Sequence, residues 1–154
     1  MKLGLEDFTP GRFGTFGPYH VSKEELIAFA AEFDPQPMHL DDEAARHTLL
    51  QGLAGSGWHL CSIMMRMMCD GFALRTASLG SPGVDEVKWL APLRPGDELM
   101  LDIDILGTRI SASKPDRGFV QTANQIRNAA GTPLLTSRFT LIVSRRDAIV
   151  ENVS

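Results

Sequence analysis

The segment SGWHLCSIMMRMMCD, residues 56–70, decides how this chain can fold. Apolar residues take most of its positions, so it predicts a long helix that is buried on nearly every side. Its few polar residues recur every three or four positions and form a single stripe: His59, Ser62, Arg66 and Asp70. Gly71 follows and supplies a residue that commonly ends helices. A helix of this kind must be covered by other elements of the fold.

The covering elements are predicted before and after this segment. A first helix starts after Ser22, because Ser22 and Glu25 have the spacing of a capping box, and a short second helix spans 41–47. Apolar residues alternate later in the chain, which is typical of strands. The expected strands are one short strand within 1–20 and longer ones at 84–91, 99–106, 119–127 and 134–145. This order predicts an α+β fold with an antiparallel sheet.

Length and composition favour one ordinary globular domain over residues 1–154. The tail 146–154 has no packing signal, which predicts disorder there. The net charge is −4 and no basic run is present, which argues against nucleic acid as a partner. The chain has no apolar run that could span a bilayer or act as a signal peptide, so we expect a cytoplasmic protein without a membrane partner. Cys61 and Cys69 lie about 12 Å apart along one helix, too far for a disulfide.

The stretch FDPQPMHLDD, residues 33–42, carries the most specific chemical signal. Proline disfavours helical backbone at the preceding residue, so Pro35 and Pro37 predict a stiff, extended connector between Asp34 and His39. Such a connector loses little entropy on folding and can hold a carboxylate and an imidazole in a fixed relation. The other interpretation is that Asp34 caps a turn and His39 is a partly buried polar residue.

These motifs resemble the MaoC-like dehydratases, the family of (R)-specific enoyl-CoA hydratases with the hotdog fold. The resemblance covers about residues 16–143. The family's signature of Asp, a proline-containing link, His and Asp is present at 34–41, and Ala45 follows. Residues 52–59 resemble the entry to the family's central helix, and 81–87 with 92–97 resemble its first sheet strand and turn. Gln36 stands where the hydratases more often have Asn. The resemblance implies an antiparallel sheet wrapped around the long central helix.

The resemblance also implies an activity. Asp34 and His39 would jointly activate a water that adds to a trans-2-enoyl thioester, and the reverse reaction would dehydrate a 3-hydroxyacyl thioester. An acyl chain bound over the pair would tune both pKa values toward neutrality by desolvation. The resemblance assigns the enolate contact to the backbone amide of Gly57, and it places Ser62 where it can hydrogen-bond the catalytic carboxylate. From the residues alone, the glycines could serve only packing, and Ser62 could bond to the preceding helical turn.

The expected substrate is a thioester of CoA, with no other cofactor and no metal, because no His/Cys spacing suggests a zinc site. Lys114 and Arg117 are candidates for the CoA phosphates. The methionines of 56–70 could form an adaptable acyl-binding surface, although core filling is the better interpretation. The resemblance implies a homodimer or a higher homo-oligomer.

Two other functions stay open. A thioesterase of the same fold would need a carboxylate on or near the central helix, where only Asp70 is available, at the far end. A non-catalytic acyl-thioester-binding protein is the third possibility, and the presence of both Asp34 and His39 argues against it.

Overall fold

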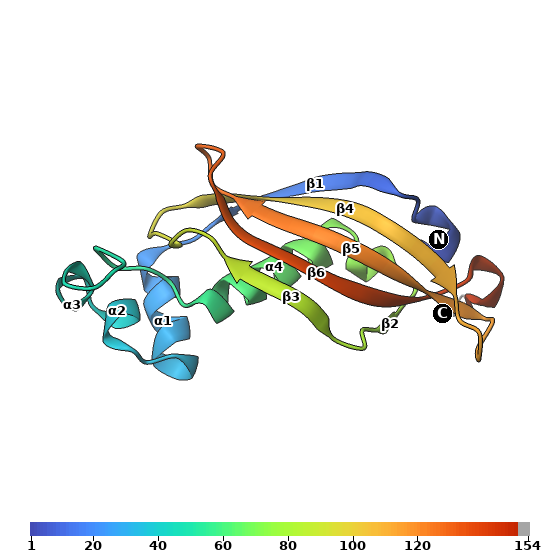
Figure 1. Cartoon of the computed structure of the whole chain (residues 1–154), viewed down its shortest axis with the longest axis horizontal. Coiled ribbons are helices and arrows are strands. Elements are labelled where there is room, and N and C mark those ends of the chain that lie inside the picture. The colour runs from blue at the N-terminus through green and yellow to red at the C-terminus, as the bar shows by residue number, and fades with distance from the viewer. Residues whose placement is uncertain (151–154) are drawn as a thin grey trace.

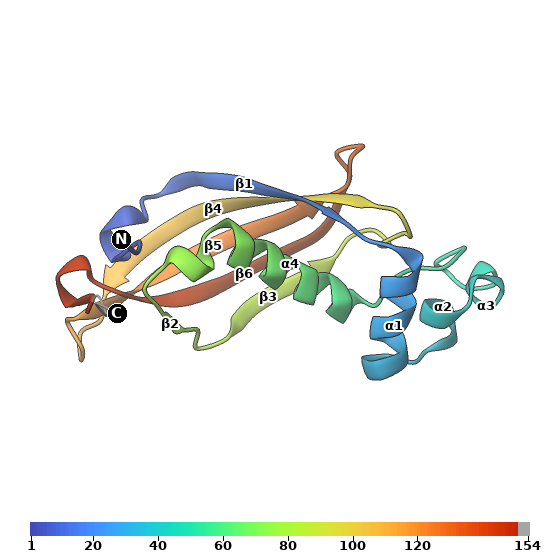
Figure 2. The same cartoon turned by 180° about the vertical axis from the view of Figure 1, so that it is seen from behind.

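A computed structural model of the chain describes residues 1–150. Its six strands form one antiparallel sheet in the order β1-β4-β5-β6-β2, with β3 also paired to β6. The helix α4 lies along one face of the curved sheet (Figures 1 and 2). The α+β prediction is therefore confirmed. The strands are β1 (Gly11–His20), β2 (Ser78–Gly80), β3 (Val84–Trp89), β4 (Glu98–Ile110), β5 (Arg117–Arg127) and β6 (Pro133–Ser144), and the helices are α1 (Lys23–Phe33), α2 (Pro37–Leu40), α3 (Asp42–Arg46) and α4 (Gly57–Gly71).

The core lies between the sheet and α4. Successive side chains of a strand point to opposite faces, and the alternation in β4 turns its apolar residues toward the helix. The buried residues of β4 are Leu99, Leu101, Ile103 and Ile105, and those of α4 are His59, Leu60, Ile63, Met64, Met67 and Met68. Three of the four methionines thus fill the core, which agrees with the preferred interpretation.

The helix α4 is buried on one side rather than on nearly every side. Trp58 and Met65 are 62% and 44% exposed, and Ser62 is also exposed. His59 does not belong to the exposed polar stripe, because the ring of Phe29 in α1 stacks on it at 4.5 Å. The prediction of a helix buried on nearly every side is therefore wrong for the single chain.

The helices α1, α2 and α3 gather at one end of the molecule (Figure 1). The predicted start of α1 is confirmed, since Ser22 accepts a hydrogen bond from the Glu25 amide at 3.1 Å. Leu26 and Ala30 anchor α1 to the core, whereas Phe33 is 66% exposed. The helix then ends at Asp34, which places this carboxylate on a packed support.

Two expectations about the ends of the chain are wrong. A ten-residue strand, β1, replaces the short strand expected within 1–20, and it pairs with β4 through two irregularities that obscure its alternation. Of the tail 146–154 expected to be disordered, the first part forms a 3₁₀ turn at Arg146–Ala148, where Arg146 pairs with Asp7 at 2.6 Å. Residues 151–154 lie outside the described part of the chain. In the described part, no helix is long and apolar enough to cross a membrane.

Candidate active site

A cavity of about 470 Å³ opens where the N-terminus of α4 meets the end of α1 and the chain after β3. Its polar wall contains Asp34, Gln36, His39, Ser56 and Gly57, and its apolar wall contains Leu50, Leu60, Trp58, Trp89, Leu90 and Leu93. Three of the four predicted site residues therefore meet in one cavity. Ser62 is the exception.

The two prolines keep the residues before them out of helical backbone, as predicted: Asp34 has φ −150° and ψ 65°, and Gln36 has φ −79° and ψ 142°. Pro37 is the first residue of the one-turn helix α2, a position that suits proline because its missing N–H would have no partner there. The connector is therefore helical after Gln36 rather than extended throughout. The turn brings His39 Nε2 to 3.4 Å from Asp34 Oδ2, with side chains that are 11% and 16% exposed.

The carboxylate of Asp34 accepts hydrogen bonds at both oxygens. Gln36 Nε2 donates to Oδ1 at 2.7 Å, and Ser56 Oγ donates to Oδ2 at 2.7 Å. These two hydrogen bonds lower the pKa of Asp34 against the opposing effect of burial, and a positive charge on His39 would lower it further. Asp34 is therefore ionised at neutral pH. The predicted rise of the Asp34 pKa toward neutrality concerns the state in which an acyl chain covers the pair. The hydrogen-bond partners of Asp34 within the protein lower this pKa instead.

The imidazole of His39 is held from its other side. Its Nδ1 lies 2.7 Å from the carbonyl oxygen of Ala54. A carbonyl can only accept, so Nδ1 carries the proton, and Nε2 of the neutral ring is the proton acceptor. This arrangement turns the basic nitrogen toward Asp34, where the two groups can share a water or a proton.

The N-terminus of α4 completes the polar wall. Ser56 is the N-cap, and its Oγ accepts from the amide of Trp58 at 3.2 Å while it donates to Asp34. Gly57 is the first residue of the helix, where backbone N–H groups have no partner within the helix. A Cβ on Gly57 would lie 2.5 Å from Trp89, whose Nε1 donates to the Gly57 carbonyl at 2.9 Å. Glycine is needed here for close packing.

The contact predicted for Ser62 is made by Ser56. Ser62 Oγ instead donates to the carbonyl of Trp58 at 3.0 Å, within its own helix. The reason is geometric: Ser56 precedes the first turn and faces Asp34, whereas Ser62 points away from the core. The sequence contained a signal for this contact. Ser56 is a good N-cap residue directly before Gly57, the glycine expected to contact the enolate oxygen.

A model of the MaoC-like domain matches residues 9–130 of the sequence. The chain belongs to this family. Among solved structures, it resembles the MaoC-like dehydratase from Rhodospirillum rubrum, with 40% identity, a TM-score of 0.83 and coverage of 94% of this chain and 98% of that one. The R-hydratase PhaJ1 from Pseudomonas aeruginosa has 17% identity, a TM-score of 0.73 and coverage of 94% and 88%. The hotdog fold is therefore confirmed.

A protein of similar sequence does not indicate an activity for this MaoC-like domain. The uncharacterized protein YdeM from Bacillus subtilis (strain 168) is 28% identical over 104 residues, which are 68% of this chain and 74% of that protein. The roles of Asp34, His39 and Gly57 in this MaoC-like domain stay predictions.

The candidates for CoA phosphates lie elsewhere in the MaoC-like domain. Lys114 lies in the β4–β5 connection and Arg117 is the first residue of β5, at the end of the molecule opposite α1–α3 (Figure 1). Arg117 is also paired with Asp116 at 2.8 Å. Within one chain, these two residues are therefore not at the cavity.

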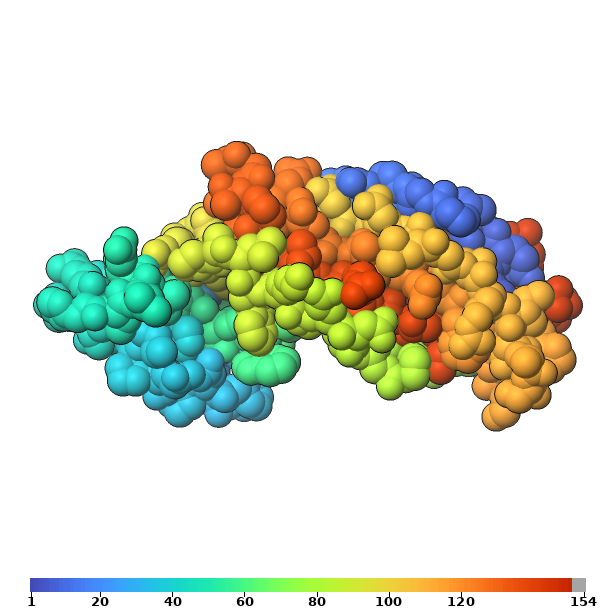
Figure 3. Space-filling view, viewed as in Figure 1, coloured from blue at the N-terminus to red at the C-terminus, as the bar shows by residue number. Residues whose placement is uncertain are grey.

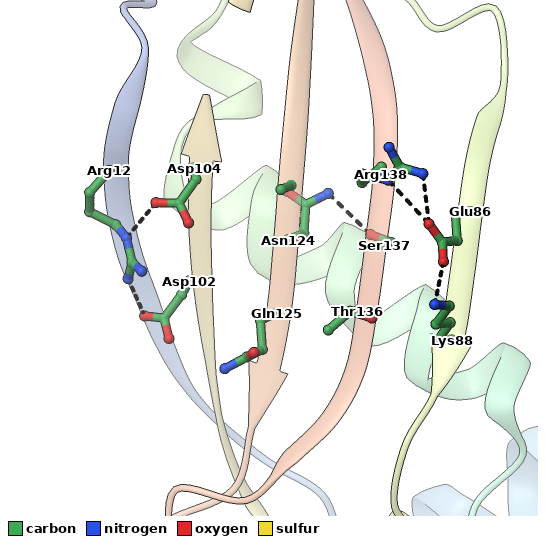
Figure 4. Close-up of a pocket in the computed structure, with 11 residues that line it drawn as sticks. Arg12, Glu86, Lys88, Asp102, Asp104, Asn124, Gln125, Thr136, Ser137 and Arg138 are labelled. Carbon is green, nitrogen blue, oxygen red and sulfur yellow. Dashed lines mark hydrogen bonds and ion pairs between the residues drawn. The ribbon is translucent and has the colours of Figure 1, made fainter. Parts of the chain in front are cut away.

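A second hollow, of about 360 Å³, lies on the face of the sheet opposite α4 (Figure 4). Its charged side chains all have opposite partners: Arg12 pairs with Asp102 and Asp104 at 3.1 and 2.7 Å, and Glu86 pairs with Lys88 and Arg138 at 2.9 and 2.7 Å. We do not assign it a role in this MaoC-like domain. Within residues 1–150, no group of three His, Cys, Asp or Glu side chains is arranged to hold a metal ion.

Proposed function

We propose that this MaoC-like protein is a hydro-lyase that hydrates enoyl thioesters of CoA or dehydrates 3-hydroxyacyl thioesters. The observation that carries the proposal is the meeting of Asp34, His39 and the N-terminus of α4 in one cavity with an apolar wall. The apolar wall suits an acyl chain, and the polar wall offers a base, a proton carrier and backbone donors. No cofactor besides the CoA of the substrate is part of the proposal.

The two side chains divide the proton transfers of hydration between them. Asp34 and the Nε2 of His39 orient a water and take one of its protons while its oxygen bonds to C3 of the enoyl group. The protonated Asp34–His39 pair then delivers a proton to C2, so that one H and one OH are added and the pair returns to its starting state. The amide of Gly57 donates to the thioester oxygen, which becomes negative in the enolate, and the partial positive charge of the helix N-terminus supports it.

Replacing Asp34 tests this proposal. We expect Asp34→Asn to lower kcat for crotonyl-CoA hydration by at least about 100-fold, because Asn cannot accept the proton. The loss of enoyl absorbance measures the rate, and chiral analysis of the product determines the stereochemistry. Asp104→Asn, on the opposite face of the sheet, is the matched control. A wild-type rate in Asp34→Asn would contradict the proposed role, and a wild-type protein inactive on a panel of enoyl and hydroxyacyl thioesters would contradict the function.

A thioesterase is less well supported. The carboxylate that it would need on the central helix is offered only by Asp70, which pairs with Arg66 at 2.9 Å at the end of α4 away from the cavity. Release of free thiol from acyl-CoA in the same panel would nevertheless favour this alternative over the hydro-lyase.

We also propose that the protein is a homodimer joined at β3. Within the described residues, β3 pairs only with β6, so its other edge is unpaired. The strand lies at the surface (Figure 3), and Val84 on it is 58% exposed. Unpaired edges favour association with another strand. Light scattering during gel filtration should give the mass of a dimer, and Val84→Lys should shift it toward the monomer; a monomeric wild type would contradict this.

A further inference from the structure

The loop from Thr48 to Ala54 holds a strained backbone beside the cavity. Gln51 has a φ of +56°, in the left-handed region that residues other than glycine rarely adopt, and Gly52 follows with a φ of +147°. Left-handed backbone costs about 1–3 kcal/mol for such a residue and persists only where the surroundings hold it. Some other part of the molecule must therefore stabilise this loop.

The guanidinium of Arg94, in the turn between β3 and β4, supplies that support. Nη1 donates to the carbonyls of Gly52 and Leu53 at 2.9 and 3.2 Å, and Nη2 donates to the carbonyl of Leu50. Within residues 1–150, Arg94 forms no ion pair, so its charge is directed to backbone oxygens. Hydrogen bonds from a charged donor are stronger than neutral ones, which explains how one side chain can hold a strained turn.

This support extends to the carbonyl that orients His39. Ala54 follows Leu53 directly, and its carbonyl accepts from His39 Nδ1 at 2.7 Å. On the other side of Ala54, the amide of Gly55 donates to the carbonyl of Leu93 at 2.8 Å. Leu93 and Arg94 therefore hold the chain on both sides of Ala54. Asp42 Oδ1, which accepts from the Leu53 amide at 3.0 Å, and the Met38 carbonyl, which accepts from the Ala54 amide at 3.4 Å, share in fixing it.

We propose that Arg94 is a positioning residue for His39. By fixing the 50–53 loop, it keeps the Ala54 carbonyl as the acceptor of the Nδ1 proton, and Nε2 is thereby kept as the proton acceptor that faces Asp34. Without Arg94, the loop relaxes, the Ala54 carbonyl shifts and the Nε2-protonated form of the ring becomes populated. The catalytic part of this inference rests on the hydro-lyase function proposed above, whereas the effect on the imidazole does not.

The first test is kinetic. We expect Arg94→Ala to lower kcat for crotonyl-CoA hydration by about 100-fold, the usual effect of a displaced catalytic group, while KM changes little. Arg94→Lys keeps the cation but donates from a single nitrogen, and we expect an intermediate kcat. Arg138→Ala, on the opposite face of the sheet, should leave kcat unchanged. A kcat equal to wild type in both Arg94 variants would overturn the proposal.

The second test does not depend on activity. Two-bond ¹H–¹⁵N spectra of the histidine rings distinguish the two neutral forms, and the His39→Gln variant assigns the His39 signals among the four histidines. At neutral pH, we expect the wild type to show His39 protonated at Nδ1, and Arg94→Lys to show a substantial Nε2-protonated fraction. Identical spectra would overturn the proposal. An inactive wild type with the expected spectra would contradict the hydro-lyase function and leave the positioning of His39 supported.

Discussion

The two hollows of this protein differ in how their polar groups are paired. On the outer face of the sheet, charged side chains of strands pair with one another across about 360 Å³ of space (Figure 4). In the cavity of about 470 Å³ at the end of α4, His39 is bonded through Nδ1 only, and its Nε2 lies at 3.4 Å from Asp34. Charge alone would favour the outer hollow as a site, whereas a group left free to accept a proton favours the cavity at the end of α4.

This difference has a physical basis. Ion pairs between strands at the surface contribute up to about 1 kcal/mol each to the stability of the fold. Because their charged groups already have partners, a ligand would gain little from binding them. In the cavity, Asp34 instead accepts hydrogen bonds from Gln36 and Ser56, and His39 Nδ1 is bonded to the Ala54 carbonyl while its Nε2 faces Asp34 at 3.4 Å. A change at the cavity, compared with a matched change elsewhere in the protein, tests this difference.

The largest effect is expected at Gly57. A Cβ at this position would lie 2.5 Å from the Trp89 ring, so Gly57→Ala must move Trp89 or the first turn of α4. We expect kcat for crotonyl-CoA to fall by about 100-fold and the free energy of unfolding to fall by about 1–3 kcal/mol. Gly107→Ala is the control, because a Cβ there meets nothing within 4 Å. Equal kinetics in the two variants would remove Gly57 from the site.

Ser56→Ala should have a smaller effect and change the pH dependence. Loss of its hydrogen bond raises the pKa of Asp34, so the acid limb of kcat/KM should move to higher pH. The lowered pKa in the folded protein also means that Asp34 stabilises the fold above its usual value of 3.8, and that this contribution is lost as pH falls through the folded pKa. Ser62→Ala should leave the pH profile unchanged. The reverse result would restore the original assignment of Ser62.

The smallest effect, on stability alone, is expected at His59. Burial lowers its pKa against the opposing effect of Glu25, and among residues 1–150 its buried Nδ1 has no hydrogen-bond partner. The unfolded chain therefore binds the proton more tightly, and His59 reduces stability as pH falls below 6.5, by at most about 1.4 kcal/mol per pH unit. His59→Phe should therefore reduce the slope of the free energy of unfolding against pH below pH 6.5. His47 is exposed, and His47→Phe should leave this slope unchanged. Equal slopes would contradict this.

The sequence predicted the elements whose periodicity is local. The limits of α4, the start of α1 and the strands after residue 84 follow from spacing, capping residues and alternation. The ten residues of β1 were underestimated, because glycines and irregular pairing interrupt their pattern, and only the partner strand β4 makes them a strand. The exposed side of α4 was also missed, since burial depends on which elements cover a helix.

The candidate site was predicted less completely. Asp34, His39 and Gly57 were identified through the family motif, and the structure places them around one cavity. The one-turn helix after Gln36 was missed, although Pro37 at its first position is a local signal. The support from Arg94 depends on contacts between residues more than 40 positions apart, which no local pattern encodes. Ser56 was within reach, because its place before the helix is visible in the sequence.

The contact between Trp58 and Trp89 has a practical consequence. These are the two tryptophans of the chain, their rings lie 5.3 Å apart, and both line the cavity. All of the intrinsic tryptophan emission of the protein therefore originates beside Gly57. Titration with an unreactive acyl-CoA analogue can accordingly be followed by fluorescence without attaching a dye, and occupancy of the cavity becomes measurable even in variants that turn over no substrate.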